Sequence, residues 1–249
     1  MRVLFLIFFP FLLFAIEGGF PDWYYEIGDT KKKKSAFFRI LIPIVQENQK
    51  KIRKDRIFVR EFYAKMLNSE LQSHDWKEIN RLAKIYRIKN IYDQRSFIKR
   101  VCAVPTSLVL AQAAIESGWG ESRFVKIANN IFGHWTFGEK GIIPEGREEG
   151  KRHKIRIFDS LEKSVAAYML NLNRHNAYKE FRDLRYISIK SKNHFGGFEA
   201  ADTMTHYSAI GEEYNEQLKR IIVQNDLLKY DEKHEEHYSD FLLSRTNAR

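Results

Sequence analysis

The chain has 249 residues, of which 44% are hydrophobic and 14% aromatic, and its 42 Lys and Arg against 32 Asp and Glu give a formal net charge of +10. This composition can bury a core, so it excludes an intrinsically disordered chain and a fibrous repeat protein. One cysteine, Cys102, excludes an intramolecular disulfide framework and any zinc site built from several cysteines. The positive charge indicates a polyanionic partner, whether nucleic acid, a membrane surface or an acidic polymer.

An uncharged apolar run follows Met1 and Arg2 and extends from Val3 to Ile16. It has the length of the apolar region of a signal peptide and is shorter than the roughly 20 residues that a membrane-spanning helix needs. We therefore expect residues 1–19 to be a signal peptide, with an uncleaved anchor or a buried N-terminal helix as alternatives. Removal of residues 1–19 takes away one basic residue, Arg2, and one acidic residue, Glu17, so the net charge stays at +10. An exported protein meets no genomic DNA, so we expect no nucleic-acid partner.

Residues 20–78 are expected to form an N-terminal helical extension. Four consecutive lysines, Lys31 to Lys34, indicate a solvated linker, with a phosphate site as the alternative. Apolar residues at helical spacing then predict one long amphipathic helix from Ile44 to Leu67 and a second helix from Trp76 to Tyr86. A third helix is predicted from Pro105 to Ser117, where Gly118 ends it.

A short β-hairpin is predicted between Gly133 and Phe158, because glycines cluster there and isoleucine alternates with arginine. The sequence D-S-L-E then predicts a helix with Asp159 as N-cap and Glu162 in a capping box. Two more helices are expected over about 176–190 and 210–224, and the charged tail, 229–249, is expected to fray. Together these elements predict a mainly α (α+β) fold.

The third helix carries the first candidate for chemistry, Glu116. It is apolar until this residue, which stands directly before the Ser-Gly-Trp-Gly sequence that ends the helix. A carboxyl group at the negative end of a helix dipole and among apolar side chains has a raised pKa. A raised pKa makes a carboxyl group an effective general acid near neutral pH. The alternative is an exposed glutamate in the last turn of the helix.

The stretches AQAAIESGWGESR and ANNIFGHW resemble the glucosaminidase domain family, glycoside hydrolase family 73, and within it the Bax-type exported proteins of Gram-negative bacteria. YSAIGEEYNEQLKRII, further along the chain, fits the same pattern, so the resemblance covers residues 79–228. It implies a lysozyme-like fold in which a helical lobe and a small β-hairpin lobe form a cleft. It also implies peptidoglycan glycan strands as the partner. The apolar run at residues 3–16 leads us to expect export to the periplasm or cell envelope of a Gram-negative bacterium, and the positive charge then indicates peripheral association with the anionic envelope surface.

The resemblance also implies roles for individual residues. Glu116 matches the family's catalytic glutamate, which is taken to protonate the leaving glycosidic oxygen. The family's second carboxylate lies on the hairpin and precedes a glycine, which favours Glu149, then Glu148, with Glu145 as a further alternative. Tyr207 matches a tyrosine that is thought to line the site, although this chain lacks the Asp that follows in the family motif.

The floor between the lobes is expected to contain Asn129, Asn130, Phe132 and Gly133, with the asparagine side chains bonding backbone or a sugar amide. Trp135 is expected either to stack on a sugar or to belong to the core. No cofactor and no metal are expected, since acid-catalysed cleavage of a glycoside needs neither.

The resemblance implies a peptidoglycan hydrolase, an endo-β-N-acetylglucosaminidase that cleaves GlcNAc-β-1,4-MurNAc. The alternatives are a muramidase or lytic transglycosylase, which cut the other linkage, and a non-catalytic glycan-binding envelope protein. Carboxyl groups about 5–5.5 Å apart would indicate a retaining reaction and about 6.5–9.5 Å an inverting one, while the 2-acetamido group of the sugar offers a substrate-assisted route. The sequence leaves these three routes open.

Overall fold

The computed structural model of the chain describes residues 18–144, 147, 150–191, 193–205, 207 and 211–231. These residues form a mainly α fold with one small antiparallel sheet, so the predicted mainly α, lysozyme-like fold class is confirmed. The elements in chain order are α1 (Asp22–Tyr25), α2 (Thr30–Leu67), α3 (Ser73–Ile85), α4 (Gln94–Arg100), α5 (Thr106–Ser117), α6 (Arg123–Ala128), β1 (Trp135–Thr136), β2 (Lys154–Ile155), α7 (Leu161–Arg174), the 3-10 helix η1 (Asn176–Tyr178), α8 (Lys179–Lys190), α9 (Gly197–Ala201), α10 (Glu212–Gln224) and the 3-10 helix η2 (Leu227–Tyr230).

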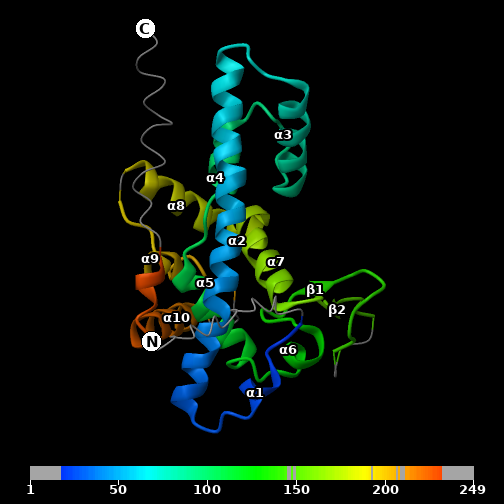
Figure 1. Cartoon of the computed structure of the whole chain (residues 1–249), viewed down its shortest axis with the longest axis vertical. Helices are drawn as coiled ribbons and strands as arrows, with labels where there is room; N and C mark the ends of the chain where they lie inside the picture. The colour runs from blue at the N-terminus through cyan, green and yellow to red at the C-terminus, as the bar shows by residue number, and fades with distance from the viewer. Residues whose placement is uncertain are drawn as a thin grey trace, which may run out of the picture.

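Helix α2 runs along most of the molecule, and α3 lies beside its C-terminal end (Figure 1). It begins before the lysine run, because the carboxylate of Asp29 accepts a hydrogen bond from the backbone N–H of Lys32 at 2.7 Å and caps the helix. The expected linker at Lys31–Lys34 is therefore wrong. Lys33 pairs with the carboxylate of Glu121, which ties the first turns of α2 to the loop after α5.

The two halves of α2 pack in two different apolar clusters. Its N-terminal part packs in the main core with α5 and α7, and every residue of α5 from Leu108 to Ala114 is buried. Its C-terminal part packs with α3 and α4 in a second cluster around Phe62 and Leu82. Because α5 is surrounded by other elements, its position and its C-terminal end are firmly determined.

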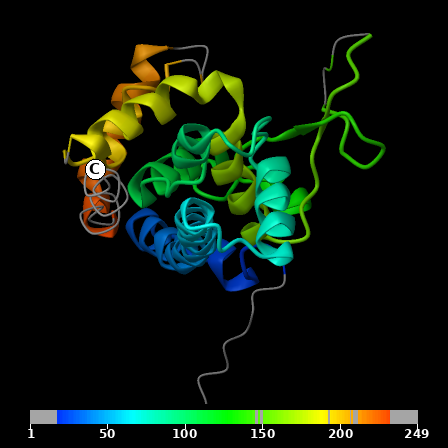
Figure 2. The same cartoon turned by 90° about the horizontal axis from the view of Figure 1, so that it is seen from above.

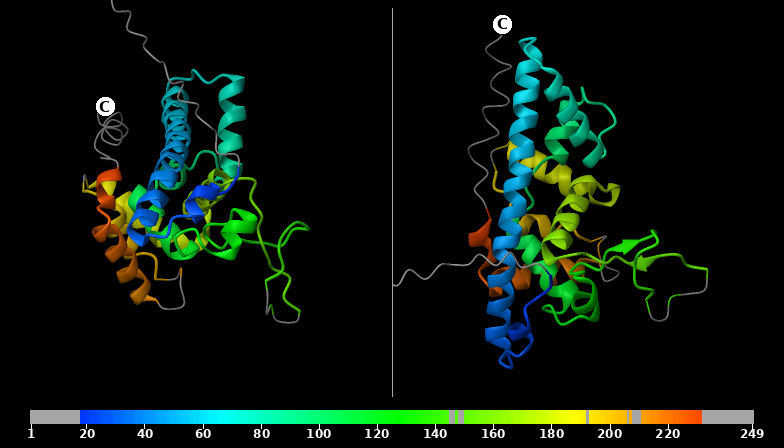
Figure 3. Two further views of the ribbon diagram at one scale, coloured as in Figure 1. Left: turned by 60° about the horizontal axis from the view of Figure 1, so that its bottom comes forward. Right: turned by 45° about the vertical axis from the view of Figure 1, so that its right-hand side comes forward.

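The predicted hairpin is present and projects away from the helices (Figures 2 and 3). Its two strands pair antiparallel, with Trp135 opposite Ile155 and Thr136 opposite Lys154. Ile142 makes a further antiparallel bridge to Ile155. An added Cβ at Gly141 would lie 2.8 Å from the Cβ of Lys154, so the close return of the chain requires glycine at this point.

Helix α7 has the expected apolar face but a different N-cap. Ser160 caps it by accepting a hydrogen bond from the N–H of Lys163 at 3.3 Å, so the predicted capping box of Asp159 and Glu162 is wrong. Glu162 instead pairs with Lys51 of α2 at 2.5 Å. The apolar face is confirmed by five buried residues, namely Leu161, Val165, Tyr168, Met169 and Leu172.

The C-terminal end of the described chain is bound to the core. The carboxylate of Asp231 accepts hydrogen bonds from the N–H of Ser107 at 2.7 Å, from the hydroxyl of Ser107 at 2.6 Å and from the N–H of Gly197 at 2.8 Å. The expected fraying is therefore wrong for residues 229–231, which these bonds and η2 hold in place.

The remainder of the expected tail, 232–249, and most of the expected signal peptide, 1–17, lie outside the described residues. No helix among the residues that are described is both long enough and apolar enough to cross a membrane.

Candidate active site

Glu116 lies in the last turn of α5, which ends at a left-handed Gly118 with φ of 55°. The N–H of Trp119 bonds back to the carbonyl of Ala114 at 2.9 Å and closes the helix end. The ring of Trp119 packs edge-on against Phe37 of α2, and its carbonyl accepts a hydrogen bond from the hydroxyl of Tyr24 at 2.5 Å. These contacts hold the backbone that carries Glu116, and they make Trp119 a packing residue.

A directed chain of hydrogen bonds ends on the Glu116 carboxyl group. The hydroxyl of Tyr168 on α7 donates to the side-chain oxygen of Gln112, which lies one turn before Glu116 on α5. The side-chain N–H of Gln112 donates to the hydroxyl of Tyr214 at 3.0 Å. The hydroxyl of Tyr214 on α10 then donates to Oε1 of Glu116 at 2.6 Å. Three helices therefore determine the orientation of one carboxyl group.

Two effects act on the ionisation of Glu116. Burial raises the pKa of this half-buried carboxyl group, because desolvation disfavours its charged form. The hydrogen bond from Tyr214 lowers the pKa, because it stabilises the carboxylate, but burial is the larger effect. The net pKa lies above the ordinary glutamate value, which is the direction expected for a general acid.

Aromatic rings surround this carboxyl group. The ring of Tyr207 stacks on that of Tyr214 with centroids 5.6 Å apart and an interplanar angle of 5°. Tyr178 lies next to Tyr207, with centroids 6.1 Å apart. Burial, and then the charge of Glu116, raise the pKa of Tyr178 to about 12, so this tyrosine is neutral at neutral pH. The hydroxyl of Tyr207 donates to the carbonyl of Phe132 at 3.4 Å.

The expected floor residues lie where the hairpin meets the helices. Asn129 is the left-handed C-cap of α6, and its side chain donates to the carbonyl of Phe158 at 3.1 Å. Asn130 is buried; its side-chain nitrogen donates to the carbonyls of His134 and Arg156, both at 2.8 Å, and its side-chain oxygen accepts the N–H of His134 at 2.9 Å. Both asparagines therefore bond backbone in this structure and hold the base of the hairpin.

The next residues connect this base to the site. The ring of Phe132 stacks on Tyr168 with centroids 3.9 Å apart, and Gly133 takes a left-handed φ of 66°. Trp135 is 61% exposed and stacks on His153 at 4.4 Å, so it does not belong to the core. Burial lowers the pKa of His134 to about 4, which leaves this side chain neutral at neutral pH.

Comparison with known proteins gives the family. Residues 98–227 match the glucosaminidase family, which is described as mannosyl-glycoprotein endo-beta-N-acetylglucosaminidase. The chain belongs to the glucosaminidase family. It is also 29% identical over 219 residues to Protein bax of Escherichia coli (strain K12), an alignment that covers 86% of this chain and 77% of that protein. Membership of the glucosaminidase family implies a glycan substrate and supports a peptidoglycan-related, glycosidase-type function.

Within this glucosaminidase domain, the structure brings Glu116, Tyr207, Phe132 and the base of the hairpin together. The three candidates for the second carboxylate, Glu145, Glu148 and Glu149, lie outside the described residues, so the choice among them stays a prediction. The described part of the chain contains no group of three or more His, Cys, Asp or Glu residues that could hold a metal. Cys102 is a free cysteine and is buried.

Tyr214 is the site residue that the sequence analysis missed. It is the second tyrosine of the stretch YSAIGEEYNEQLKRII, in which the resemblance gives a role only to the first, Tyr207. Its spacing to Leu218 and Ile222, four and eight residues later, places it on the buried face of α10. A tyrosine on that face needs a hydrogen-bond partner, and this requirement is the signal that could have identified it.

Proposed function

We propose that this glucosaminidase is an exported peptidoglycan hydrolase, an endo-β-N-acetylglucosaminidase that cleaves GlcNAc-β-1,4-MurNAc. In this reaction protonated Glu116 gives its proton to the glycosidic oxygen while the bond from that oxygen to the anomeric carbon of GlcNAc breaks. Water supplies the hydroxyl group that takes the place of the glycosidic oxygen on the anomeric carbon. The products are a new reducing-end GlcNAc and a free hydroxyl group on MurNAc.

The observation that carries this proposal is the state of Glu116. Its carboxyl group has a raised pKa and is held by a hydrogen bond from Tyr214. The ring of Tyr214 stacks on Tyr207, whose hydroxyl bonds to the carbonyl of Phe132 at the base of the hairpin. Another carboxylate close by, Glu121, contrasts with it: hydrogen bonds from Lys126 and Lys33 lower the pKa of Glu121, which suits it for an ion pair rather than for proton donation. The two glutamates are five residues apart in the chain, and their pKa values are shifted in opposite directions.

The linkage that is cut distinguishes this proposal from its enzymatic alternatives. Purified protein is incubated with peptidoglycan, and the soluble fragments are analysed by mass spectrometry before and after borohydride reduction. Reducing-end GlcNAc supports a glucosaminidase. Reducing-end MurNAc would instead indicate a muramidase, and 1,6-anhydro-MurNAc a lytic transglycosylase. Retention of glycan by a protein that releases no fragments would indicate a non-catalytic binding protein.

The second carboxyl group is proposed to be Glu149, which directly precedes Gly150 on the hairpin. Three single variants test this choice, namely Glu149→Gln, Glu148→Gln and Glu145→Gln, because each keeps the size of the side chain and removes its charge. Glu149→Gln is expected to lose about 10²-fold or more in activity, and the other two are expected to stay within a few-fold of the parent. A large loss in either of the others would move the assignment to that residue.

Export is proposed from the apolar run at residues 3–16. In the full chain the carbonyl of Gly18 accepts a hydrogen bond from the N–H of Leu161 at 3.2 Å. A chain that begins at Phe20 would lack this acceptor. The intact mass of the protein recovered from the cell envelope tests export and distinguishes removal of residues 1–17 from removal of residues 1–19. An unprocessed mass in the cytoplasm would contradict export.

A further inference from the structure

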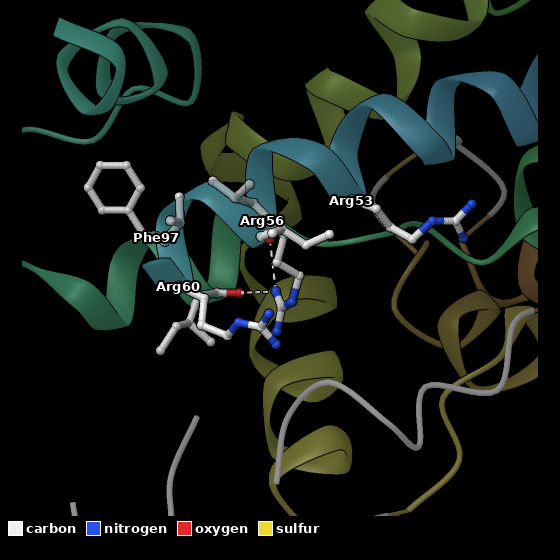
Figure 4. Close-up of a pocket in the computed structure, with 8 residues that line it drawn as sticks. Arg53, Arg56, Arg60 and Phe97 are labelled. Carbon is white, nitrogen blue, oxygen red and sulfur yellow. Dashed lines mark hydrogen bonds between the residues drawn. The ribbon is translucent and has the colours of Figure 1, made fainter. Parts of the chain in front are cut away.

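Arginines near the ends of α3, α4 and α7 bond backbone carbonyls at the C-terminal ends of helices. Figure 4 shows the case of Arg56, whose guanidinium donates to the carbonyls of Ile98 at 3.2 Å and Val101 at 2.8 Å, at the end of α4. A cation at such an end is stabilised by the negative pole of the helix dipole. A second group of arginines has this role too, but the role uses only part of its donors.

The second group consists of Arg87, Arg100 and Arg174, here named the arginine cluster, and it lies where the C-terminal ends of α3 and α7 meet. Nη1 of Arg100 donates to the carbonyl of Arg174 at 2.9 Å. The same nitrogen donates to the carbonyls of Tyr86 at 3.0 Å and Arg87 at 3.4 Å. Nη1 of Arg174 donates to the carbonyl of Ile85 at 3.0 Å. One nitrogen of each of these two guanidinium groups therefore holds the helix ends together.

The other donors of the arginine cluster have no acceptor among the residues that the structure describes. Nε of Arg174 is buried without a hydrogen-bond partner there. The side chain of Arg87 is exposed, and it makes neither a hydrogen bond nor an ion pair with any described residue. Because an N–H group shielded from water needs an acceptor, the arginine cluster is short of acceptors.

The arginine cluster also has an excess of positive charge. Burial, and then the charge of Arg87, lower the pKa of both Arg100 and Arg174, so the guanidinium groups are close enough to repel one another. Asp93 opposes this effect at Arg100, but its carboxylate caps α4 by accepting the N–H of Ser96 at 3.0 Å. A carboxylate from outside the chain would supply both the missing acceptors and the missing negative charge.

A row of aromatic rings leads from the Glu116 carboxyl group to the arginine cluster. Successive ring centroids are 5.6, 6.1 and 6.1 Å apart, in the order Tyr214, Tyr207, Tyr178 and His175. His175 directly follows Arg174 in the chain. A peptide of four residues spans up to about 14 Å when extended, which is comparable with the length of this row. A peptide that begins near Glu116 can therefore bring its carboxylates to the arginine cluster.

We propose that the arginine cluster binds carboxylates of the peptide branches of peptidoglycan while the glycan strand lies at Glu116. MurNAc, a partner in the linkage proposed to be cut, is the sugar that carries these branches. Arg87 provides a guanidinium with no contact of its own in the described structure, which suits it to select strands that bear peptides. This inference rests on the proposed peptidoglycan substrate, but it does not depend on which linkage is cut.

Binding of glycan strands without cleavage tests the proposal. Every protein is the full chain with Glu116→Gln, and strands with intact peptides are compared with the same strands after their carboxylates are converted to amides. This conversion keeps the size of the peptides and removes their charge. Without further changes the protein is expected to bind intact strands about 10-fold more tightly than amidated strands.

Arg87→Asn is expected to reduce this preference about 5-fold, because it removes one guanidinium while asparagine tolerates the left-handed φ of 54° at this residue. The matched control is Lys77→Gln on the same helix, α3, whose exposed side chain likewise makes no hydrogen bond or ion pair with the described residues. It removes the same charge and is expected to leave the preference unchanged. If Arg87→Asn does not fold, Arg87→Gly takes its place, since glycine favours positive φ.

Equal affinity for intact and amidated strands, or no binding of either, would overturn the proposal. So would an equal loss of preference in Arg87→Asn and Lys77→Gln, because the attraction would then come from the overall charge. Vesicles of anionic phospholipid that bind more weakly to Arg87→Asn, while strand binding is unaffected, would show that the ligand is a lipid phosphate instead.

The products of the parent protein separate this inference from the proposed function. Reducing-end MurNAc together with a preference that depends on Arg87 would contradict the proposed linkage and support the peptide site. Reducing-end GlcNAc together with no preference would support the proposed function and overturn the peptide site.

Discussion

Glu116 is subject to two opposing effects, and the hydrogen bond from Tyr214 is the one that a single substitution removes. Tyr214→Phe takes away the donor that stabilises the carboxylate, so the pKa of Glu116 rises further. Because the reaction needs the protonated acid, we expect the basic limb of the pH–rate profile to move to higher pH by about one unit. The measurement is kcat/KM on soluble peptidoglycan fragments as a function of pH.

Tyr207→Phe is the matched comparison, because Tyr207 stacks on Tyr214 while its own hydroxyl bonds to Phe132. This variant is expected to leave the basic limb in place, whatever it does to the rate. If Tyr207→Phe moved the limb and Tyr214→Phe did not, the role given to Tyr214 would be wrong.

The ionisation of Glu116 also affects stability. Between the ordinary pKa of a glutamate and its raised pKa in the folded protein, the folded state binds more protons at this group than the unfolded state. The stabilisation is therefore complete at low pH and is lost as the pH rises through this window. The free energy of unfolding of the parent is expected to fall, relative to that of Glu116→Gln, as the pH is raised, and urea titrations at several pH values measure this difference.

Glu121→Gln is the control for this measurement, because the pKa of Glu121 is lowered by its hydrogen bonds to Lys126 and Lys33. Its stabilising contribution is present above the ordinary pKa and is lost as the pH falls. The difference between the parent and Glu121→Gln should therefore have the opposite pH dependence. The same sign for both variants would contradict the burial effect at Glu116.

At this scale the sequence predicted the catalytic candidate but not its partner. An apolar helix that ends in a carboxyl group before Gly118 is a local pattern that makes Glu116 a candidate, and its catalytic role is implied by the resemblance to the family. Tyr214 is 98 residues away in the chain, and only the packing of α10 on α5 brings it to Glu116. The bond from the Asn130 side chain to the carbonyl of Arg156, 26 residues later, likewise depends on where the hairpin returns.

At the scale of elements, Asp231 connects the N-terminal ends of α5 and α9. Asp231→Ala removes the acceptor of three hydrogen bonds, so we expect the free energy of unfolding to fall by about 1–3 kcal/mol. Chemical denaturation measures this change. Asp226→Asn is the control, because the side chain of Asp226 is 76% exposed and pairs only with Lys229 in the described structure, and asparagine tolerates the left-handed backbone at this residue; its effect should stay within about 0.5 kcal/mol. Equal effects would contradict the anchoring role of Asp231.

The longer helices were predicted well because apolar spacing is a repeated signal, whereas their ends depend on single residues. The prediction of a linker at Lys31–Lys34 was wrong because it rested on charge alone. The start of α2 at Thr30 depends on Asp29, which caps the helix. Ser160 rather than Asp159 caps α7, although both residues favour that position. The short helices α4, α6 and α9 were not predicted, since five to seven residues carry too little periodicity.

At the scale of the whole molecule, the charge of +10 bears on how the protein would find peptidoglycan, its proposed substrate. The peptides of peptidoglycan carry carboxylates, so a basic protein is attracted to the polymer beyond the contacts of its active site. We expect binding to purified sacculi to weaken several-fold between about 50 and 300 mM salt, because the ions screen this attraction. Co-sedimentation measures it, and binding that is insensitive to salt would contradict an electrostatic contribution.

The central claim is that Glu116 donates the proton that breaks the glycosidic bond, and one comparison tests it directly. The release of soluble fragments from peptidoglycan is measured for the parent, for Glu116→Gln and for Glu121→Gln, each verified as folded by circular dichroism. Glu116→Gln is expected to lose about 10²–10⁴-fold in rate, because it keeps the shape of the side chain without a transferable proton, while Glu121→Gln stays close to the parent. A Glu116→Gln protein that releases fragments as fast as the parent would contradict the claim.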